Sequence, residues 1–153
     1  MDNEFFPTIA QLVRWKQAKR EQMLPPMLTA GKIMTLTGCD GIGATKGFMG
    51  GSRVICDPAP TNTDRDIVVL VYSVPNAQYA LECKGWFGNS EDYGIIGEED
   101  FRSLRRGDDN IMLVSNPEEY GAILAATCIA MRMNLTEKKD RYALFETARL
   151  NWR

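Results

Sequence analysis

Two acidic residues at the start of an apolar run are the side chains best suited to chemistry in this sequence. Asp64 and Asp66 are separated by one residue and lead into Ile67 to Val71, a run typical of a buried strand. Successive side chains on a strand point to opposite faces, so the two carboxylates share a face, about 6–7 Å apart. Two carboxylates so placed can hold a pair of divalent cations about 3.5–4 Å apart, which clamp a phosphoryl group during its transfer.

A glycine turn precedes this acidic pair. Gly50 and Gly51 lack the Cβ that would keep backbone N–H groups away from a phosphate, and Ser52 adds a hydroxyl. Taken alone, the spacing of Asp64 and Asp66 favours a polar strand entry with exposed acids. The glycine turn reverses that preference, and together the two stretches predict a site for a triphosphate and its metal ions.

The combination of these motifs resembles a known superfamily. Gly50-Gly51-Ser52-Arg53, a spacer and then Asp64-x-Asp66 are similar to the DNA polymerase beta-like nucleotidyltransferases. Segments 101–114, 125–135 and 139–145 resemble small nucleotidyltransferase-like proteins of tailed bacteriophages, so that the resemblance extends over about residues 45–150.

The resemblance implies roles for these residues. Asp64 and Asp66 would bind two Mg²⁺ (or Mn²⁺) ions, and Ser52 with the Gly51 backbone would hold the triphosphate of an NTP. A nucleoside monophosphate would then pass from the NTP to a hydroxyl group on RNA, protein or a small molecule.

The third acid of the superfamily pattern is missing from this chain. The pattern places an acid before the apolar run that begins at Ile111, and Asn110 stands there instead. Asparagine is a neutral metal ligand and cannot act as a base. Asp108 would share the face of Asn110 if the strand extends that far, and would then serve as the base, whereas Asp109 points away. The alternative is that residues 107–110 form a turn.

Several arginines are candidates for phosphate binding. Arg53 directly follows the serine and offers a planar donor fork to a β- or γ-phosphate, or it is a surface arginine beside a turn. Arg102, Arg105 and Arg106 form the densest basic cluster. Arg102 and its neighbours would contact nucleotide phosphates or an RNA end, or else provide charge on a solvated sheet edge.

Composition excludes several classes of function. The 153 residues are 44% hydrophobic and 25% charged, as expected for one globular domain. There is no histidine, which excludes histidine-dependent triads and argues against a zinc site. The net charge of −2 argues against a general electrostatic grip on nucleic acid.

Cysteine usage and the N-terminus indicate the compartment. The four cysteines are far apart and include no C-x-x-C pair, so we expect reduced thiols in a cytosol. No apolar run approaches the ~20 residues that span a bilayer, and the N-terminus is acidic rather than signal-like. We therefore expect no membrane partner and a cytoplasmic location, in the host if a phage encodes the chain.

Periodicity and end signals predict the order of elements. Thr8-x-x-Gln11 is a capping box that opens a helix, which Pro25 and Pro26 end. Asn116 and Pro117 are a cap and first residue for a later helix. The remaining expected elements are strands at 32–37, 45–49, 67–71, 93–96, 101–106 and 110–114, and helices at 76–86 and 135–149.

These observations predict one α/β (α+β) domain over residues 1–153. A small mixed sheet with helices on one face would form a nucleotidyltransferase-like core at about 30–115, followed by a C-terminal helical pair at about 116–150. The leading function is a metal-dependent nucleotidyltransferase. The alternative is a catalytically silent phage accessory protein of this fold that binds nucleotide or a host protein, and a third option is half of a toxin–antitoxin pair.

Overall fold

A six-stranded mixed sheet is the centre of the described structure. The computed structural model describes residues 8–11, 14, 24–61, 63–88 and 100–151. Within them the strand order is β1-β2-β3-β6-β5-β4, and β3 and β6 form the parallel pair while the other neighbours are antiparallel. The strands are β1 (Met27–Thr29), β2 (Ala44–Gly50), β3 (Arg65–Val71), β4 (Phe87–Gly88), β5 (Phe101–Arg106) and β6 (Asp109–Val114).

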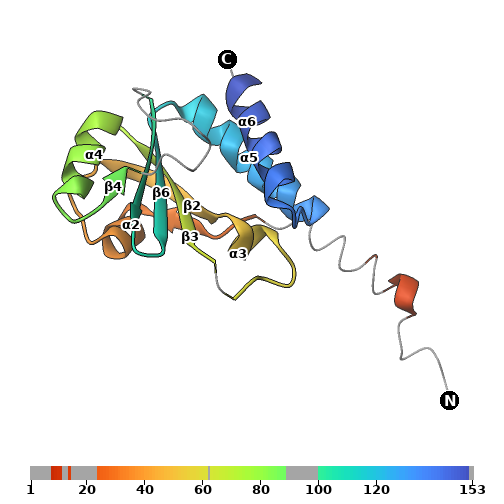
Figure 1. Ribbon diagram of the computed structural model, residues 1–153. Coiled ribbons are helices and arrows are strands. Elements are labelled where there is room, and N and C mark those ends of the chain that lie inside the picture. Colours follow the sequence, from red (N-terminus) through yellow and green to blue (C-terminus); the bar gives the residue numbers. More distant parts are fainter. Residues whose placement is uncertain (1–7, 12–13, 15–23, 62, 89–99, 152–153) are drawn as a thin grey trace.

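Helices cover both faces of this sheet (Figure 1). One face packs against α2 (Ala30–Thr37) and α4 (Val74–Glu82), and the other against α3 (Ser52–Ile55) and the C-terminal pair, α5 (Pro117–Met133) and α6 (Lys138–Asn151). The expected mixed α/β fold with an added C-terminal helical pair is confirmed. The expectation that helices cover one face is wrong, because the strands bury apolar side chains on both faces and each face is covered by helices. None of the described helices combines the length and the apolar character needed to span a membrane.

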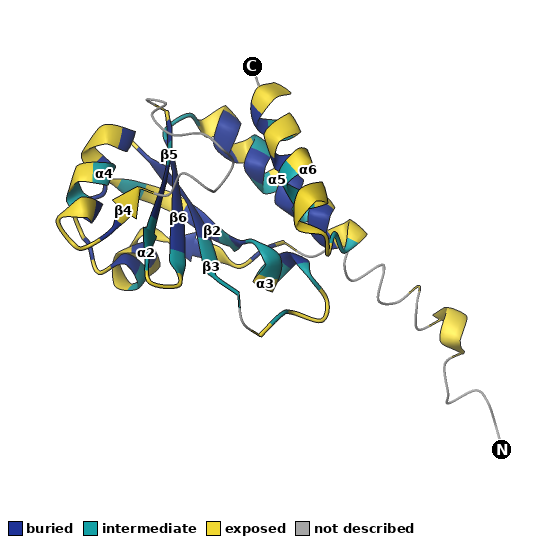
Figure 2. Ribbon diagram, viewed as in Figure 1, coloured by how far each residue is buried: buried dark blue, intermediate teal, exposed yellow. Residues whose placement is uncertain are grey.

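Strand β3 lies in the middle of the fold because its apolar run is buried on both sides (Figure 2). Ile67, Val69 and Val71 contribute to the core beneath α2 and α4. Val68 and Leu70 contribute to the core beneath α5. A strand covered on both faces has a continuous apolar sequence, which agrees with the prediction of a buried strand at this run.

The C-terminal helices are held by a cap and by a buried ion pair. The Asn116 side chain accepts hydrogen bonds from the N–H groups of Glu118 and Glu119, and so caps α5 as predicted. Arg149 of α6 donates to the carboxylate of Glu119 at 2.8 Å, and both side chains are almost fully buried. The guanidinium also lies 3.7 Å from the centroid of the Phe101 ring, so α6 is fixed against both α5 and the sheet.

The strand expected at 32–37 is wrong, because these residues form α2. Alternating β-branched residues suggested a strand, yet the Thr29 side chain accepts a hydrogen bond from the N–H of Lys32 and so caps a helix. Gly38, at φ 69°, ends that helix in the left-handed conformation. Ile33 and Thr37, one helical turn apart, are its buried residues, so end signals and burial outweigh β propensity.

Other boundaries differ from the prediction for local reasons. Helix α4 begins at Val74 rather than Asn76, because Ser73 caps it and proline is tolerated in a first helical turn. Helix α6 begins at Lys138, three residues after the expected start. The Thr8 capping box forms, with reciprocal hydrogen bonds to Gln11. The strand expected at 93–96 lies outside the described residues.

Candidate functional site

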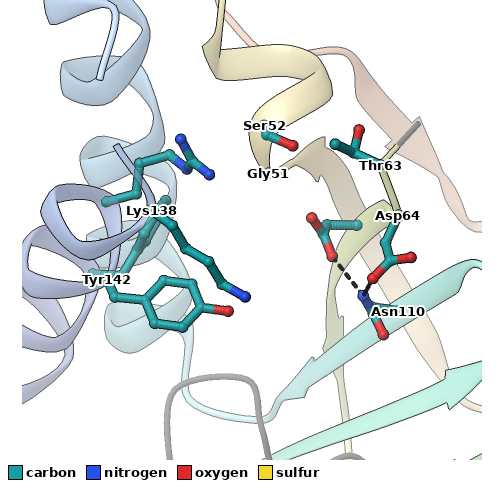
Figure 3. Close-up of a pocket in the computed structure, with 10 residues that line it drawn as sticks. Gly51, Ser52, Thr63, Asp64, Asn110, Lys138 and Tyr142 are labelled. Carbon is teal, nitrogen blue, oxygen red and sulfur yellow. Dashed lines mark hydrogen bonds between the residues drawn. The ribbon is translucent and has the colours of Figure 1, made fainter. Parts of the chain in front are cut away.

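A pocket of about 290 Å³ lies between the carboxyl end of β2 and helix α6. One side, which we call the acidic wall, comes from the ends of β3 and β6, and the other, the helical wall, comes from α6 (Figure 3). The lining residues are Gly51, Ser52, Thr63, Asp64, Asp66, Asn110, Lys138, Arg141, Tyr142 and Phe145.

Gly51 brings the turn after β2 into contact with the acidic wall. Its backbone has φ 72° and ψ −171°, a combination that is essentially confined to glycine. A Cβ at this position would overlap the Asp66 carboxylate, with the Asp66 Cγ only 2.7 Å away. Gly50, one residue earlier, is the strand partner of Asp66. The glycine turn therefore lies directly against the acidic pair, as the sequence predicted.

Asp64 and Asp66 converge on the side-chain amide of Asn110. The Asn110 Nδ2 donates to Asp64 Oδ2 at 3.3 Å and to Asp66 Oδ1 at 3.1 Å (Figure 3). Asn110 is the parallel strand partner of Asp66 and is only 2% exposed. Both carboxylates thus lie on the same side of the sheet, which meets the geometric expectation drawn from their spacing.

Arg105 joins this wall from the neighbouring strand. Its NH2 group donates to Asp64 Oδ1 at 2.8 Å, and its Nε donates to the Gly107 carbonyl at 2.9 Å. Arg105 is paired with Asn110 across β5 and β6, which explains why it faces the same side. The acidic wall therefore contains two carboxylates, one guanidinium and one amide.

The opposite face of the same strand ends carries a separate ion pair. Arg65 and Asp109 form two hydrogen bonds, of 2.8 and 2.9 Å. These residues alternate with Asp66 and Asn110 along β3 and β6, so they point away from the pocket. The prediction that Asp109 points away is confirmed.

The helical wall presents two cations with different environments. The Arg141 NH1 donates to the carbonyls of Leu135 and Thr136 and contacts the Cys56 Sγ, so this guanidinium is engaged in joining α6 to the loop after α3. The Lys138 ammonium lies 5.2 Å from the centroid of the Tyr142 ring and makes no ion pair with any residue of the described segments. It points across the pocket toward the acidic wall (Figure 3).

Hydroxyl groups line the end of the pocket near the glycine turn. Ser52 begins α3, and Thr63 immediately precedes Asp64. Within the described part of the chain, the Thr63 Oγ1 is buried and has no hydrogen-bond partner. A buried hydroxyl without a partner costs free energy, and a ligand oxygen or a water molecule in the pocket would satisfy it.

A reciprocal contact joins the segment after α3 to the turn between α5 and α6. The backbone N–H of Asp57 donates to the Asn134 side chain at 2.9 Å, and the Asn134 amide donates to the Asp57 carbonyl at 3.1 Å. Asn134 ends α5 in the left-handed conformation, and Asp57 lies just after α3. The segment after the glycine turn is thereby fixed to the turn that precedes the helical wall.

Three predicted site residues are not brought to the pocket. The expectation that Asp108 shares a strand face with the acidic pair is wrong, because β6 begins at Asp109 and Asp108 lies exposed in the turn before it. Arg53 is exposed on α3 and does not line the pocket. Arg102 shares the face of Leu104, which packs beneath α2 and α4, and therefore lies on the side of the sheet opposite the pocket.

The helical wall was not assigned to the site from the sequence. One helical face carries two cations followed by two aromatic side chains, at the spacing of helical turns: Lys138, Arg141, Tyr142 and Phe145. That mixture was a signal that this face meets a polar cavity rather than an apolar core. The position of this helical face opposite Asp64 depends on how α6 packs against the sheet, and the spacing of residues along the helix does not specify that packing.

Comparison of the chain with family models, with curated proteins and with solved structures gives no match. The function therefore rests on the site itself. An acidic wall can hold a cation, a glycine turn with two hydroxyls can approach phosphate oxygens, and a lysine on the facing wall can pair with an anion. These are the groups that a metal-bound polyphosphate requires.

Proposed function

We propose that the protein is a metal-dependent nucleotidyltransferase that binds a nucleoside triphosphate in this pocket and transfers a nucleoside monophosphate to a hydroxyl acceptor. The observation that carries the proposal is the convergence of Asp64 and Asp66 beside the Gly51 turn. The resemblance of the same residues to the nucleotidyltransferase motif supports it independently of the geometry.

The residues present fit a divalent cation. Mg²⁺ is usually held by one or two carboxylates together with substrate phosphates and water, and Asp64 and Asp66 supply that number. They would hold Mg²⁺ or Mn²⁺, and the bound ion would neutralise part of the negative charge of the phosphates. No group of three or more acidic, cysteine or histidine residues suited to a metal occurs among the described residues.

The other lining residues have roles in binding the nucleotide. The Ser52 and Thr63 hydroxyls donate to phosphate oxygens at the glycine turn, where Gly51 leaves room for close approach. Lys138 pairs with the phosphates from the facing wall as a mobile point charge. The Tyr142 ring offers aromatic surface against which a base or ribose packs, whereas Phe145 is buried and belongs to the core.

A second function, nucleotide binding without transfer, is favoured by one specific observation. The position of the third acid is occupied by Asn110, and the nearest alternative, Asp108, lies in the exposed turn. A general base typically contributes about 10²–10⁴-fold to the rate of such a step. Its loss would slow transfer and leave triphosphate binding intact.

Nucleotide binding is tested by thermal unfolding with each of the four NTPs and Mg²⁺. A ligand at about 100 times its Kd stabilises the native state by about 2.7 kcal/mol, or about 5–10 °C in Tm for a domain of this size. We expect Asp64→Asn to abolish the Mg²⁺-dependent part of this increase. Asp108→Asn is the matched control, because it removes the same charge outside the pocket. An unchanged Tm of the wild-type protein with every NTP would refute both functions.

Transfer is tested with NTPs labelled on the α-phosphate, with Mg²⁺ or Mn²⁺ and a bacterial lysate. Label on a macromolecule that depends on Asp66 supports the transferase. Full nucleotide binding without transfer of label supports the second function. If Asn110→Asp then restores transfer of label, the missing carboxylate is the reason for the inactivity of the natural chain.

A further inference from the structure

We propose that the acidic wall binds a single divalent cation, shared with the triphosphate, rather than the pair of cations that the sequence motif implies. This inference rests on the proposed nucleotide binding and concerns the composition of the same site. It follows from the two residues that contact the carboxylates, Arg105 and Asn110.

Arg105 takes one side of the acidic pair. Its guanidinium donates to Asp64 Oδ1 at 2.8 Å, and the hydrogen bond from its Nε to the Gly107 carbonyl fixes its orientation. With two carboxylates and one guanidinium, the wall carries a net charge of −1. A second cation would face this guanidinium at short range, and the repulsion between like charges would oppose its binding.

Asn110 fills the position between the two carboxylates. Its amide NH2 is the group that satisfies Asp64 Oδ2 and Asp66 Oδ1 together, since an amide oxygen there would face two anions. A second cation bound at this point would need an oxygen ligand where the structure presents N–H donors. The amide thus takes the place of a cation in joining the two acids.

Burial strengthens the assignment of Asn110. The residue is 2% exposed and lies inside the sheet beside Asp66. A carboxylate at this position would be buried against two others, which is unfavourable unless a cation lies among them. We therefore expect Asn110→Asp to create the second cation site and to make the stability of the protein depend on divalent cations.

The stoichiometry is measured by equilibrium dialysis of the full chain with Mn²⁺ and a non-hydrolysable NTP analogue, with bound metal and bound analogue determined separately. One Mn²⁺ for each bound analogue is the expected result for the wild-type protein. Two Mn²⁺ would overturn this inference and leave the proposed function standing. Failure of both metal and analogue to bind would overturn the proposed function and the inference with it.

Two variants test the residues that set the stoichiometry. Asn110→Asp should bind two Mn²⁺ for each analogue and should show a larger Mn²⁺-dependent increase in Tm than the wild-type protein. Arg105→Gln should tighten binding of the single Mn²⁺ by up to about fivefold, the effect of a partly exposed ion pair. Arg102→Gln is its matched control, since it removes the same charge from the same strand on the opposite face. Equal Mn²⁺ affinity for the Arg105 variant, the Arg102 variant and the wild-type protein would contradict the role of Arg105.

Discussion

Replacement of Gly51 by alanine is the sharpest test of the geometry of the pocket. The backbone at Gly51, with φ 72° and ψ −171°, strains any other residue by about 1–3 kcal/mol. The new methyl group would also overlap the Asp66 carboxylate and lie 3.0 Å from the Asp66 Cβ. Rotation of the Asp66 side chain could move the carboxylate away, but the tight contact with the Cβ, which is fixed to β3, would remain. Such overpacking costs about 1–3 kcal/mol more.

The expected loss of stability is therefore about 2–6 kcal/mol. A change of 1 kcal/mol shifts Tm by about 2–4 °C in a domain of this size, so Gly51→Ala should lower Tm by about 4–24 °C. The displaced Asp66 should also weaken any increase in Tm that Mg²⁺ and NTP produce in the wild-type protein. Both effects are measured by calorimetry or by circular dichroism at increasing temperature.

Gly107→Ala is the matched control for this substitution. Gly107 also has a positive φ, of 60°, but a Cβ there would meet no atom of the described structure within 4 Å. The control should cost only the strain of the left-handed conformation, about 1–2 kcal/mol, and should keep the full response to ligand. If the two variants melt at the same temperature and respond equally to ligand, the contact between Gly51 and Asp66 is not as described.

Two further substitutions test features that support the site. Glu119→Gln removes the buried carboxylate that the Arg149 guanidinium contacts in α5, so we expect a loss of about 3–5 kcal/mol in urea unfolding. Lys139→Gln is an exposed control. A loss below about 1 kcal/mol would contradict the contribution of this pair. Burial raises the pKa of Tyr120 to about 12 from an ordinary value of 10.0. The native state then holds the proton more tightly than the unfolded state, so stability falls as pH rises from about 10 to 12. Tyr120→Phe should reduce this alkaline loss of stability. It should not destabilise the protein near neutral pH, because the hydroxyl has no hydrogen-bond partner in the described structure. An equally steep alkaline loss in the variant would show that Tyr120 is not its source.

The parts of the fold that were predicted correctly are those in which local pattern and tertiary burial agree. The local sequence predicts the observed conformation at three places: the apolar run of β3, the turn at Gly51 and the helix cap at Asn116. The prediction of a strand at 32–37 was wrong because the β-branched residues of this segment favour a strand, whereas the end signals at Thr29 and Gly38 favour a helix. Where two local signals conflict, the packing of the whole domain selects between them.

For the candidate site, the sequence identified the acidic pair, the glycine turn and Asn110, but not the facing helix or the contact from Arg105. The spacing of Asp64 and Asp66 determines which face they share, so their convergence was predictable. The approach of Arg105 depends on the pairing of β5 with β6, and the approach of Lys138 depends on the docking of α6. Arg102 was proposed because it belongs to a dense basic cluster. Side chains alternate between the two faces of a strand, so neighbouring members of such a cluster lie on opposite faces, and Arg102 lies on the face away from the pocket.

The contact between Asp57 and Asn134 has a consequence for the kinetics of folding. It joins residues 77 positions apart, so the segment after α3 meets the turn before α6 only when a long segment of chain has closed. Because the entropy of closing so long a loop is lost before the contact contributes, we expect this contact to be absent from the transition state for folding. A ligand that bridges the two walls would then stabilise the native state but not the transition state. It should slow unfolding and leave the rate of folding nearly unchanged.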